Sequence, residues 1–397
     1  MKLFALFLVS IFLYATSVET LVEHAKNSHL SLEAIKHKLS ALDNEYAVSR
    51  NFANPELSLS MSDIQLQDIS NRSLEPMQYT AININQKIPY FGKRDAASQK
   101  IEAQKAQLNM SLEEVKVKLT KAIKISAFTI WSLEEQLKIV DDYISLTKQN
   151  IELFSAYSVN DSSAHMSIMN AELTLSQLKI KKSKLDSALI GQYKNISYLS
   201  DMDVTSVEAD MGMSEPHPMD YYLDAVNSNK TYKMKEAELE VASADVKVKE
   251  LAGFIDPVVQ VGYFRREKFE DYMSVGIGFS LPIYGSERSK EEVARKIVLS
   301  TKSETEDTRN QLSSQISAVY TQLQSSYKIY NILQNELLPQ LEHMKDLTSS
   351  SLKSGADLFL YIQMLEKKLT LDEQNIDAIA LYHQNLATLE ALIGEEL

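Results

Sequence analysis

The sequence has no cysteine, and it has little proline or glycine. Without a thiol, disulfides, thiolate catalysis, cysteine-ligated zinc and a lipid anchor on cysteine are all excluded. Only eight prolines and ten glycines occur in 397 residues, and so few chain breakers favour long uninterrupted elements. Basic residues are also scarce, because 41 Lys and Arg against 54 Asp and Glu give a net charge of −13. Such a chain is poorly suited to nucleic acid, which requires a basic face.

Long apolar runs are scarce as well. The one at the N-terminus follows Lys2 and covers residues 3–15, which is shorter than the roughly 20 residues of a membrane-spanning helix. A basic start, a short apolar run and small residues behind it are typical of a secretory signal peptide, here residues 1–17. An N-terminal membrane anchor is the alternative. We expect the mature chain to be exported.

The sequence contains an internal duplication. "IPYFGKR" (residues 88–94) is matched by "LPIYGSE" (residues 281–287) at an offset of 193 residues. The same offset superimposes apolar residues that recur every seven positions further on, from Ile123 on Ile316 to Ile151 on Met344. A shared motif and a shared heptad phase together indicate two structural repeats. We place them at residues 18–212 and 213–397.

Each repeat has the same order of parts. A helical segment comes first, at about 18–50 and about 219–251, and alternating apolar residues such as Leu57, Leu59 and Met61 then indicate strands. The pattern predicts one β-hairpin in each repeat, within residues 54–88 and 256–281. The predicted strand-to-helix elbows contain Pro89 and Gly92 in the first repeat, and Pro282 and Gly285 in the second. Proline ends a strand because it has no N–H to donate, and glycine permits the turn that follows.

A long helical hairpin follows each elbow, over residues 93–200 and 286–394. The stretch from Lys93 to about Tyr157 has neither proline nor glycine, which as a helix would be on the order of 95 Å long. Its heptad repeat predicts coiled-coil packing against a partner helix. The second long helix contains Pro339, where we expect a kink. The predicted fold class is mainly α with a small β part: duplicated coiled-coil hairpins and four β-strands per chain.

Four strands cannot close a membrane barrel, since single-chain barrels begin at about eight, and two isolated hairpins are unstable in water. Aromatic residues nevertheless lie in or beside the strands, as a membrane girdle requires: Tyr79, Tyr263, Phe264, Tyr272 and Phe279. One solution is a trimeric 12-stranded β-barrel continued by an α-helical tunnel. A soluble four-stranded sheet capped by coiled coil is the alternative.

The order of hairpin, elbow, long helix and returning helix, twice over, resembles the TolC-type outer membrane efflux proteins (outer membrane factors). Pro339, Leu352-x-x-Gly355 and "LFLYIQMLEKKL" correspond to the family's second helical tip, with Leu352 where a tyrosine is usual. The elbow "PYFGKR" is most similar to members that serve heavy-metal and cation pumps. The resemblance implies a homotrimer that contacts outer membrane lipid in a Gram-negative bacterium and extends far into the periplasm.

The function that the resemblance implies is that of an exit duct in a tripartite efflux pump. The implied partners are a periplasmic adaptor (membrane fusion) protein and an inner-membrane pump of the RND type. Metal ions, drugs and other small molecules all remain candidate substrates. A periplasmic adaptor, or a structural coiled-coil protein without channel activity, is the alternative, although an adaptor would have one helical hairpin rather than two.

The two helical tips are the candidate gate and adaptor-docking sites. The first contains Asn160 and Asp161, and the second contains Gly355 and Asp357. In the family, acidic residues just beyond the second tip glycine can ring the aperture. Here those positions are Tyr361 and Met364, so such a ring would fall to Asp161 and Asp357. Helix capping is the alternative for both aspartates.

No catalytic motif appears in the sequence, so we expect neither an enzyme nor a cofactor. The segment from Met211 to Met219 combines methionines with His217, which are soft ligands suited to Cu(I) or Ag(I). Pro216 and Pro218 in the same segment favour a plain linker between the repeats. We assign no metal site.

Overall fold

The computed structural model describes residues 16–157, 162–352 and 358–395. The chain is mostly helical with a few strands, as the sequence predicts. It divides into two compact units. The helical unit comprises residues 1–33, 113–230 and 309–397, and the sheet unit comprises residues 34–112 and 231–308. Each unit therefore takes segments from both predicted repeats, and the repeat boundaries themselves stay a prediction.

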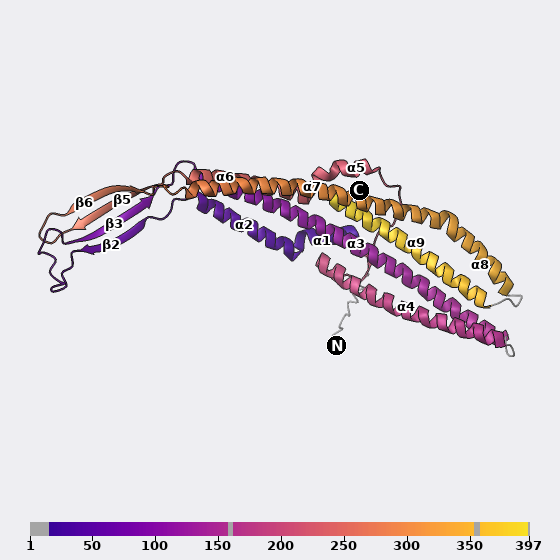
Figure 1. The fold of residues 1–397 in the computed structure, drawn as a ribbon. Helices are drawn as coiled ribbons and strands as arrows, with labels where there is room; N and C mark the ends of the chain where they lie inside the picture. Colours follow the sequence, from indigo (N-terminus) through magenta and orange to yellow (C-terminus); the bar gives the residue numbers. More distant parts are fainter. Residues whose placement is uncertain (1–15, 158–161, 353–357, 396–397) are drawn as a thin grey trace, which may run out of the picture. The chain divides into compact units, whose positions relative to one another are not determined.

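The sheet unit contains one four-stranded antiparallel sheet (Figure 1). Its strands are β2 (Glu56–Ser62), β3 (Tyr79–Lys87), β5 (Pro257–Arg265) and β6 (Tyr272–Phe279), in the order β2-β3-β5-β6. Strands β2 and β3 form one antiparallel pair along the chain, and β5 and β6 form another. They are joined into one sheet because β3 pairs with β5, a contact between the repeats that the separate hairpin patterns do not reveal.

Four helical segments complete the sheet unit. They come from α2 (Leu30–Arg50), the first part of α3 (Lys93–Tyr157), α6 (Lys230–Ala252) and the first part of α7 (Ser286–Ile332). Helix α3 is unbroken over the range that the sequence predicts. Two ion pairs connect the first part of α3 to neighbouring helices. Lys100 Nζ lies 2.8 Å from Asp245 of α6, and Lys105 Nζ lies 2.5 Å from Asp43 of α2.

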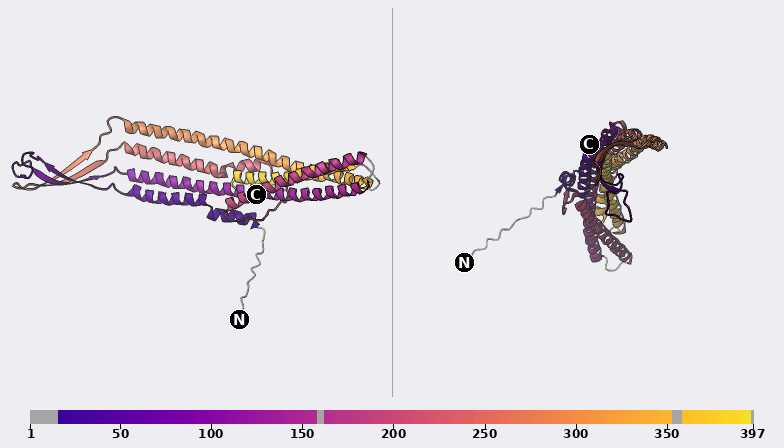
Figure 2. Two further views of the ribbon diagram at one scale, coloured as in Figure 1. Left: turned by 90° about the horizontal axis from the view of Figure 1, so that it is seen from below. Right: turned by 90° about the vertical axis from the view of Figure 1, so that its left-hand side faces the viewer.

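The helical unit contains α1 (Val18–Ser28), α4 (Ser162–Ser200), α5 (Met219–Asp224), α8 (Leu338–Leu352), α9 (Leu358–Ile393) and the remaining parts of α3 and α7. A short parallel pair, β1 (Thr16–Ser17) with β4 (Val207–Glu208), also belongs to it. Helix α4 returns beside α3, and α9 returns beside α8 (Figures 1 and 2). The bounds predicted for the two helical hairpins stay a prediction, because the residues that connect α3 to α4 and α8 to α9 lie outside the described ranges. Within the ranges described, no helix is both long and apolar enough to cross a membrane.

The predicted kink in the second long helix takes the form of a π-turn. Helix α7 ends at Ile332, residues Leu333–Leu337 form a π-helix, and α8 begins at Leu338. Pro339 has no N–H for the carbonyl of Asn335, and its ring crowds that carbonyl. Widening the preceding turn relieves the clash, which explains why the irregularity precedes the proline.

Two further breaks were not predicted. The helix expected at about 18–50 is interrupted at His29, whose extended backbone and ring Nδ1, 3.2 Å from the N–H of Ser31, begin α2. The helix expected at about 219–251 is interrupted by the 3₁₀ turn Ala225–Ser228 and Asn229. The Asn229 amide donates to the carbonyl of Leu392 in α9 at 2.7 Å. The bond at His29 is local, between residues two positions apart, whereas the bond of Asn229 is tertiary. Helix propensity alone reveals neither break.

Candidate functional site

The four-stranded sheet has one apolar face. The strand register places residues of alternating positions on the same side. Thr80, Gln86 and Arg265 lie on this side near the ends of the strands. Its apolar members are Leu57, Leu59, Met61, Ile82, Ile84, Val259, Val261, Tyr263, Met273, Val275, Ile277 and Phe279. Most of them are exposed, with Leu59 at 73 % and Val275 at 71 %. We call this surface the apolar face. A contiguous exposed surface of this kind marks an interaction site rather than a solvated face.

The opposite face of the sheet is polar or small, and we call it the polar face. Its central members are Ser58, Ser60, Asn83, Asn85, Gln260, Gly262, Ser274, Gly276 and Gly278. A Cβ at Gly262 would lie 2.4 Å from the side-chain oxygen of Asn83 and 2.7 Å from the Phe264 ring, so a larger residue there would displace these side chains. The central parts of the two faces thus differ in character, one being apolar and the other polar or small.

The five aromatic residues predicted beside the strands are divided between the two faces. Tyr263 and Phe279 lie near opposite ends of the apolar face. Tyr79, Phe264 and Tyr272 lie on the polar face, where Phe264 stacks on Tyr272 at 4.6 Å between ring centroids and meets Tyr79 edge-on at 4.9 Å. Only two of the five are therefore placed for a girdle on the apolar side. The other three form an aromatic cluster at the loop end of the polar face.

The glycines of both elbows have a positive φ. Gly92 has a φ of 87° and Gly285 a φ of 72°, a left-handed conformation that costs other residues roughly 1–2 kcal/mol. Strand β3 ends two residues before Pro89, and β6 ends three residues before Pro282. The motif is therefore a strand terminator followed by a left-handed turn into a helix.

The first elbow is fastened by Asp256, a residue that the sequence analysis did not single out. Its Oδ1 accepts hydrogen bonds from Lys93 Nζ at 2.7 Å and from the N–H of Tyr90 at 2.8 Å. Lys87 Nζ lies 3.4 Å from the other carboxylate oxygen. Partial burial acts to raise the pKa of Asp256, but these partners hold that pKa below its usual value. Tyr90 also stacks on Phe254, with 4.5 Å between ring centroids.

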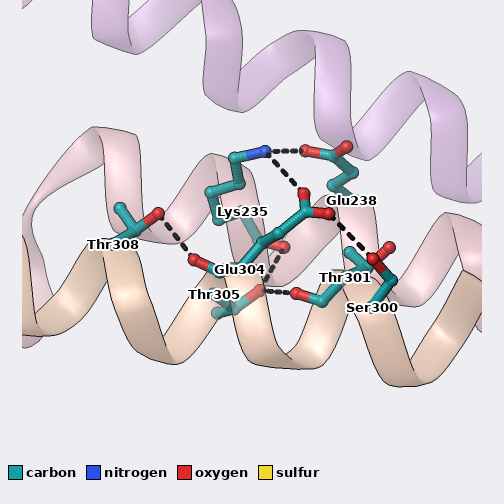
Figure 3. Close-up of polar contacts among 7 residues, drawn as sticks. All are labelled: Lys235, Glu238, Ser300, Thr301, Glu304, Thr305 and Thr308. Atoms are coloured by element: carbon teal, nitrogen blue, oxygen red, sulfur yellow. Dashed lines mark hydrogen bonds and ion pairs between the residues drawn. The ribbon is translucent and has the colours of Figure 1, made fainter.

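Within the sheet unit, α6 and α7 contact each other through polar side chains (Figure 3). Lys235 Nζ of α6 lies 2.8 Å from Glu238 of the same helix and 3.7 Å from Glu304 of α7. The hydrogen bond to Glu238 raises the pKa of this lysine. The hydroxyl of buried Thr305 donates to the carbonyls of Thr301 and Lys235. Both Thr301 and Thr305 are buried at this contact.

In the helical unit, polar contacts fasten α9 to α3 and α4. Lys181 of α4 pairs with Glu373 of α9, and one heptad away Thr174 donates to Glu366 at 2.8 Å. From α3, the Tyr143 hydroxyl donates to Asp372 at 3.1 Å. Burial raises the pKa of Tyr143. These contacts join the two helical hairpins, and the matching heptad spacing of their partners on α4 and α9 is a signal that a pairwise sequence search could have found.

The structure places two of the predicted tip residues in the core of this helical packing. Tyr361 and Met364 of α9 are buried beside Val140 and Tyr143 of α3 and Leu178 of α4. Asn160, Asp161, Gly355 and Asp357 lie outside the described residues. The assignment of all six to a gate or docking site stays a prediction. The predicted signal peptide does so too, since residues 1–15 are also outside and Thr16 and Ser17 form β1.

The segment from Met211 to Met219 packs against α9. The hydroxyl of Tyr382 donates to the carbonyl of Ser214 at 2.7 Å, and the His217 ring lies 4.9 Å from that of Tyr221. Throughout the described chain, no cluster of three or more His, Asp or Glu side chains is arranged to hold a metal ion. These contacts are those of a connecting segment between the repeats.

Comparison by sequence finds no matching protein-family model and no matching curated protein. Comparison of folds finds several solved structures. The outer membrane protein VceC from Vibrio cholerae is 14 % identical with a TM-score of 0.78, over 96 % of this chain and 96 % of VceC. The MtrE outer membrane channel of Neisseria gonorrhoeae, in its open state, is 13 % identical with a TM-score of 0.78, over 95 % and 89 %.

CusC, studied for the conformational changes that accompany folding and transmembrane channel formation, is 14 % identical with a TM-score of 0.79, over 95 % of this chain and 92 % of CusC. At these identities the likeness concerns the fold. It confirms the fold that the resemblance implies, that of the TolC-type outer membrane efflux channels.

Proposed function

We propose that this chain forms an outer membrane channel, the exit duct of a tripartite efflux pump. The fold is similar to those of the outer membrane protein VceC and the MtrE outer membrane channel. The observation that carries the proposal is the sheet with an exposed apolar face and a polar reverse. A soluble sheet would bury its apolar face against helices or a second sheet, whereas a barrel wall turns that face to lipid and the polar face to a water-filled lumen.

The proposed assembly is a homotrimer with a 12-stranded barrel. Four strands per chain are too few to close around a lumen, and three copies give an even number within the range of known barrels. The apolar face, from Phe279 to Met273 along β6, spans seven residues, or roughly 20 Å before tilting. This approaches the apolar band of about 25 Å that outer membrane barrels present to lipid. The long helices would then continue the duct as an α-helical tunnel.

The proposed location is the outer membrane of a Gram-negative bacterium, with the helices in the periplasm. The partners would be a periplasmic adaptor and an inner-membrane pump of the RND type, engaged at the helical tips around Asn160, Asp161, Gly355 and Asp357. Metal ions, drugs and other small molecules fit the proposal equally. In this proposal the exported molecules pass through the pore of the channel, and neither catalysis nor a cofactor takes part. An adaptor or a structural coiled-coil protein would leave the exposed apolar face without a purpose.

Two neighbouring substitutions on β6 test the proposal. Val275→Lys places a charge on the apolar face, and Ser274→Lys places the same charge on the polar face. Near the bilayer midplane a lipid-facing lysine costs about 2–4 kcal/mol per chain. We expect Val275→Lys to abolish recovery of the protein from detergent-extracted outer membranes, and Ser274→Lys to assemble and to change only ion conductance in planar bilayers.

The readouts are outer membrane fractionation, native mass in detergent and single-channel conductance. Equal tolerance of both lysines would contradict a lipid-facing sheet. A wild-type chain that remains a monomer in water without detergent would also contradict the proposed duct.

A further inference from the structure

The edge strands β2 and β6 each have only one neighbour in the four-stranded sheet. Each therefore presents a row of backbone N–H and C=O groups that a further strand can pair with. Strands β2 and β6 run in opposite directions, as the first and fourth strands of an antiparallel sheet must. A second copy of the chain can thus continue the sheet by placing its β2 against β6.

The duplication extends to the hydrogen-bond register. A shift of 202 residues carries β2 onto β5, and a shift of 193 residues carries β3 onto β6. The pair Leu59 and Ile82 becomes the pair Val261 and Val275 in this way. All seven pairs between β2 and β3 map onto observed pairs between β5 and β6. The two hairpins are therefore equivalent in pairing, and not only in sequence pattern.

Inside one chain, the two hairpins are connected by the pairing of β3 with β5. If the hairpins are equivalent, β6 of one copy can pair with β2 of the next copy in the same register. Applying the same two shifts to the observed pair Ile84 and Val261 gives Ile277 opposite Leu59 of the partner subunit. We infer that β6 pairs with the partner subunit's β2 in this one register. It sets Val275 opposite the partner's Met61, and Phe279 opposite the partner's Leu57. The inference rests on the proposed trimer and specifies its interface.

The register keeps both faces continuous across the interface. Valine, isoleucine and phenylalanine of β6 meet leucine and methionine on the apolar face. On the polar face, Gly276 lies opposite the partner's Ser60, and Gly278 opposite the partner's Ser58. A slip of one residue would turn the partner's serines toward lipid. A slip of two residues would keep the faces but break the equivalence of the joints.

The elbows supply an independent argument. Within the chain, Lys87 and Lys93 lie against Asp256. The same shifts carry the two lysines onto Ser280 and Ser286, and carry the aspartate onto Asn54 of the partner subunit. The joint between copies thus loses positive and negative charge together. Unrelated surfaces have no reason to change in concert, whereas two sides of one interface do, because an unmatched charge there is costly.

The apolar contact at the elbow is repeated as well. The stacked pair Tyr90 and Phe254 maps onto Ile283 and the partner's Phe52. In the single chain, Ile283 is 71 % exposed and Phe52 is 53 % exposed. The inferred register therefore brings together two large exposed apolar side chains from opposite edges of the sheet unit. Both the strands and the elbows point to the same alignment.

Cysteine cross-linking tests this register directly, since the native chain has no thiol. Facing residues in antiparallel strands have Cα atoms about 4.5–5.5 Å apart, which a disulfide can bridge, while separations above about 7 Å cannot be bridged. We expect Ile277→Cys with Leu59→Cys, oxidised in isolated outer membranes, to yield mostly covalent trimer on denaturing gels. The shifted pairs, Ile277→Cys with Leu57→Cys or with Met61→Cys, should remain almost entirely monomeric.

The matched control is Ile84→Cys with Val261→Cys, the equivalent pair inside one chain. It should form a disulfide without changing the number of chains. Covalent trimer from a shifted pair would overturn the register and leave the duct intact. Absence of cross-linking in all three test pairs, with the control oxidised and the membrane-embedded trimer intact under reducing conditions, would overturn the pairing of β6 with β2. A water-soluble monomer would overturn the proposed function itself.

Discussion

The two elbows share one backbone design but are fastened differently. Gly92 and Gly285 both adopt the left-handed conformation, and a proline precedes each by three residues. The first elbow is then held by ion pairs and hydrogen bonds to Asp256. Within the described chain, the second elbow makes only local backbone bonds, such as Ser289 N–H to the Gly285 carbonyl. Phe91 and Tyr284, the aromatic residues just before the glycines, are about nine-tenths exposed in both.

The comparison separates what a turn requires from what an interface requires. Backbone geometry must be the same in both repeats, because each must convert a strand into a long helix. Fastening residues are free to differ, because one joint lies inside a chain and the other is proposed to lie between chains. A joint inside a chain forms during folding of that chain. A neutral contact between chains avoids the cost of removing charged side chains from water when the copies assemble.

Removing the fastening of the first elbow should have the largest effect. Asp256→Ala leaves the largely buried ammonium of Lys93 without its carboxylate and leaves the Tyr90 N–H without an acceptor. We expect a loss of about 3 kcal/mol in the free energy of unfolding, measured by urea denaturation of the detergent-solubilised protein. Asp256→Asn should lose less, since it can still accept from Tyr90. Asn54 is the counterpart of Asp256 in the first repeat. If Asp256→Ala lowered the free energy of unfolding less than Asn54→Ala does, the contacts of Asp256 would not be important for stability.

The equivalence of the two turns can be broken at the glycines. Gly92→Ala and Gly285→Ala each force an L-residue into a positive φ, which should cost roughly 1–2 kcal/mol. Side-chain space does not distinguish them, because a Cβ at Gly92 would meet Leu251 at an ordinary 3.7 Å and one at Gly285 would meet nothing within 4 Å. We therefore expect similar losses in the temperature at which the trimer unfolds. A loss at one glycine only would show that the elbows are not equivalent.

The elbows and strands were predictable because local signals define them. Proline, glycine and period-2 alternation lie within a few residues of one another, and α3 lacks any breaker. Asp256 was missed because its role depends on contacts with Tyr90 and Lys93, more than 160 positions earlier. The division of aromatic residues between the faces likewise follows from strand register. The break at Asn229 depends on its bond to Leu392, which no local pattern encodes.

The ion pair of the first elbow can be transferred to the proposed interface between chains. Ser286→Lys and Asn54→Asp recreate in the proposed interface the pair formed by Lys93 and Asp256. Each single variant should weaken the trimer slightly, and the double variant should recover about 0.5–1 kcal/mol as a coupling energy. The measurement is heat dissociation of the trimer on semi-native gels, repeated at high salt to screen the new pair. Strictly additive single effects would mean that the two positions do not meet.

Low pH should destabilise the contacts of the first elbow, which contain Asp256, and leave those of the second elbow unchanged. Of the four predicted effects on stability, this one should be the smallest. The pKa of Asp256 is held below its usual value in the folded chain by Lys93, Tyr90 and Lys87, against the opposing influence of burial. Between its folded and unfolded pKa values, the unfolded chain binds more protons, so stability falls as the pH falls. The contribution is complete above about pH 4 and is lost as the pH drops through the folded pKa.

We therefore expect the wild type to lose stability below pH 4 more steeply than Asp256→Asn, which cannot titrate at this position. Comparing trimer melting temperatures of the two proteins from pH 6 to pH 3 isolates the contribution from that of other carboxylates. Parallel pH profiles would show that the Asp256 clamp adds nothing that depends on charge, and the difference between a charged and a neutral joint would then be one of hydrogen bonding alone.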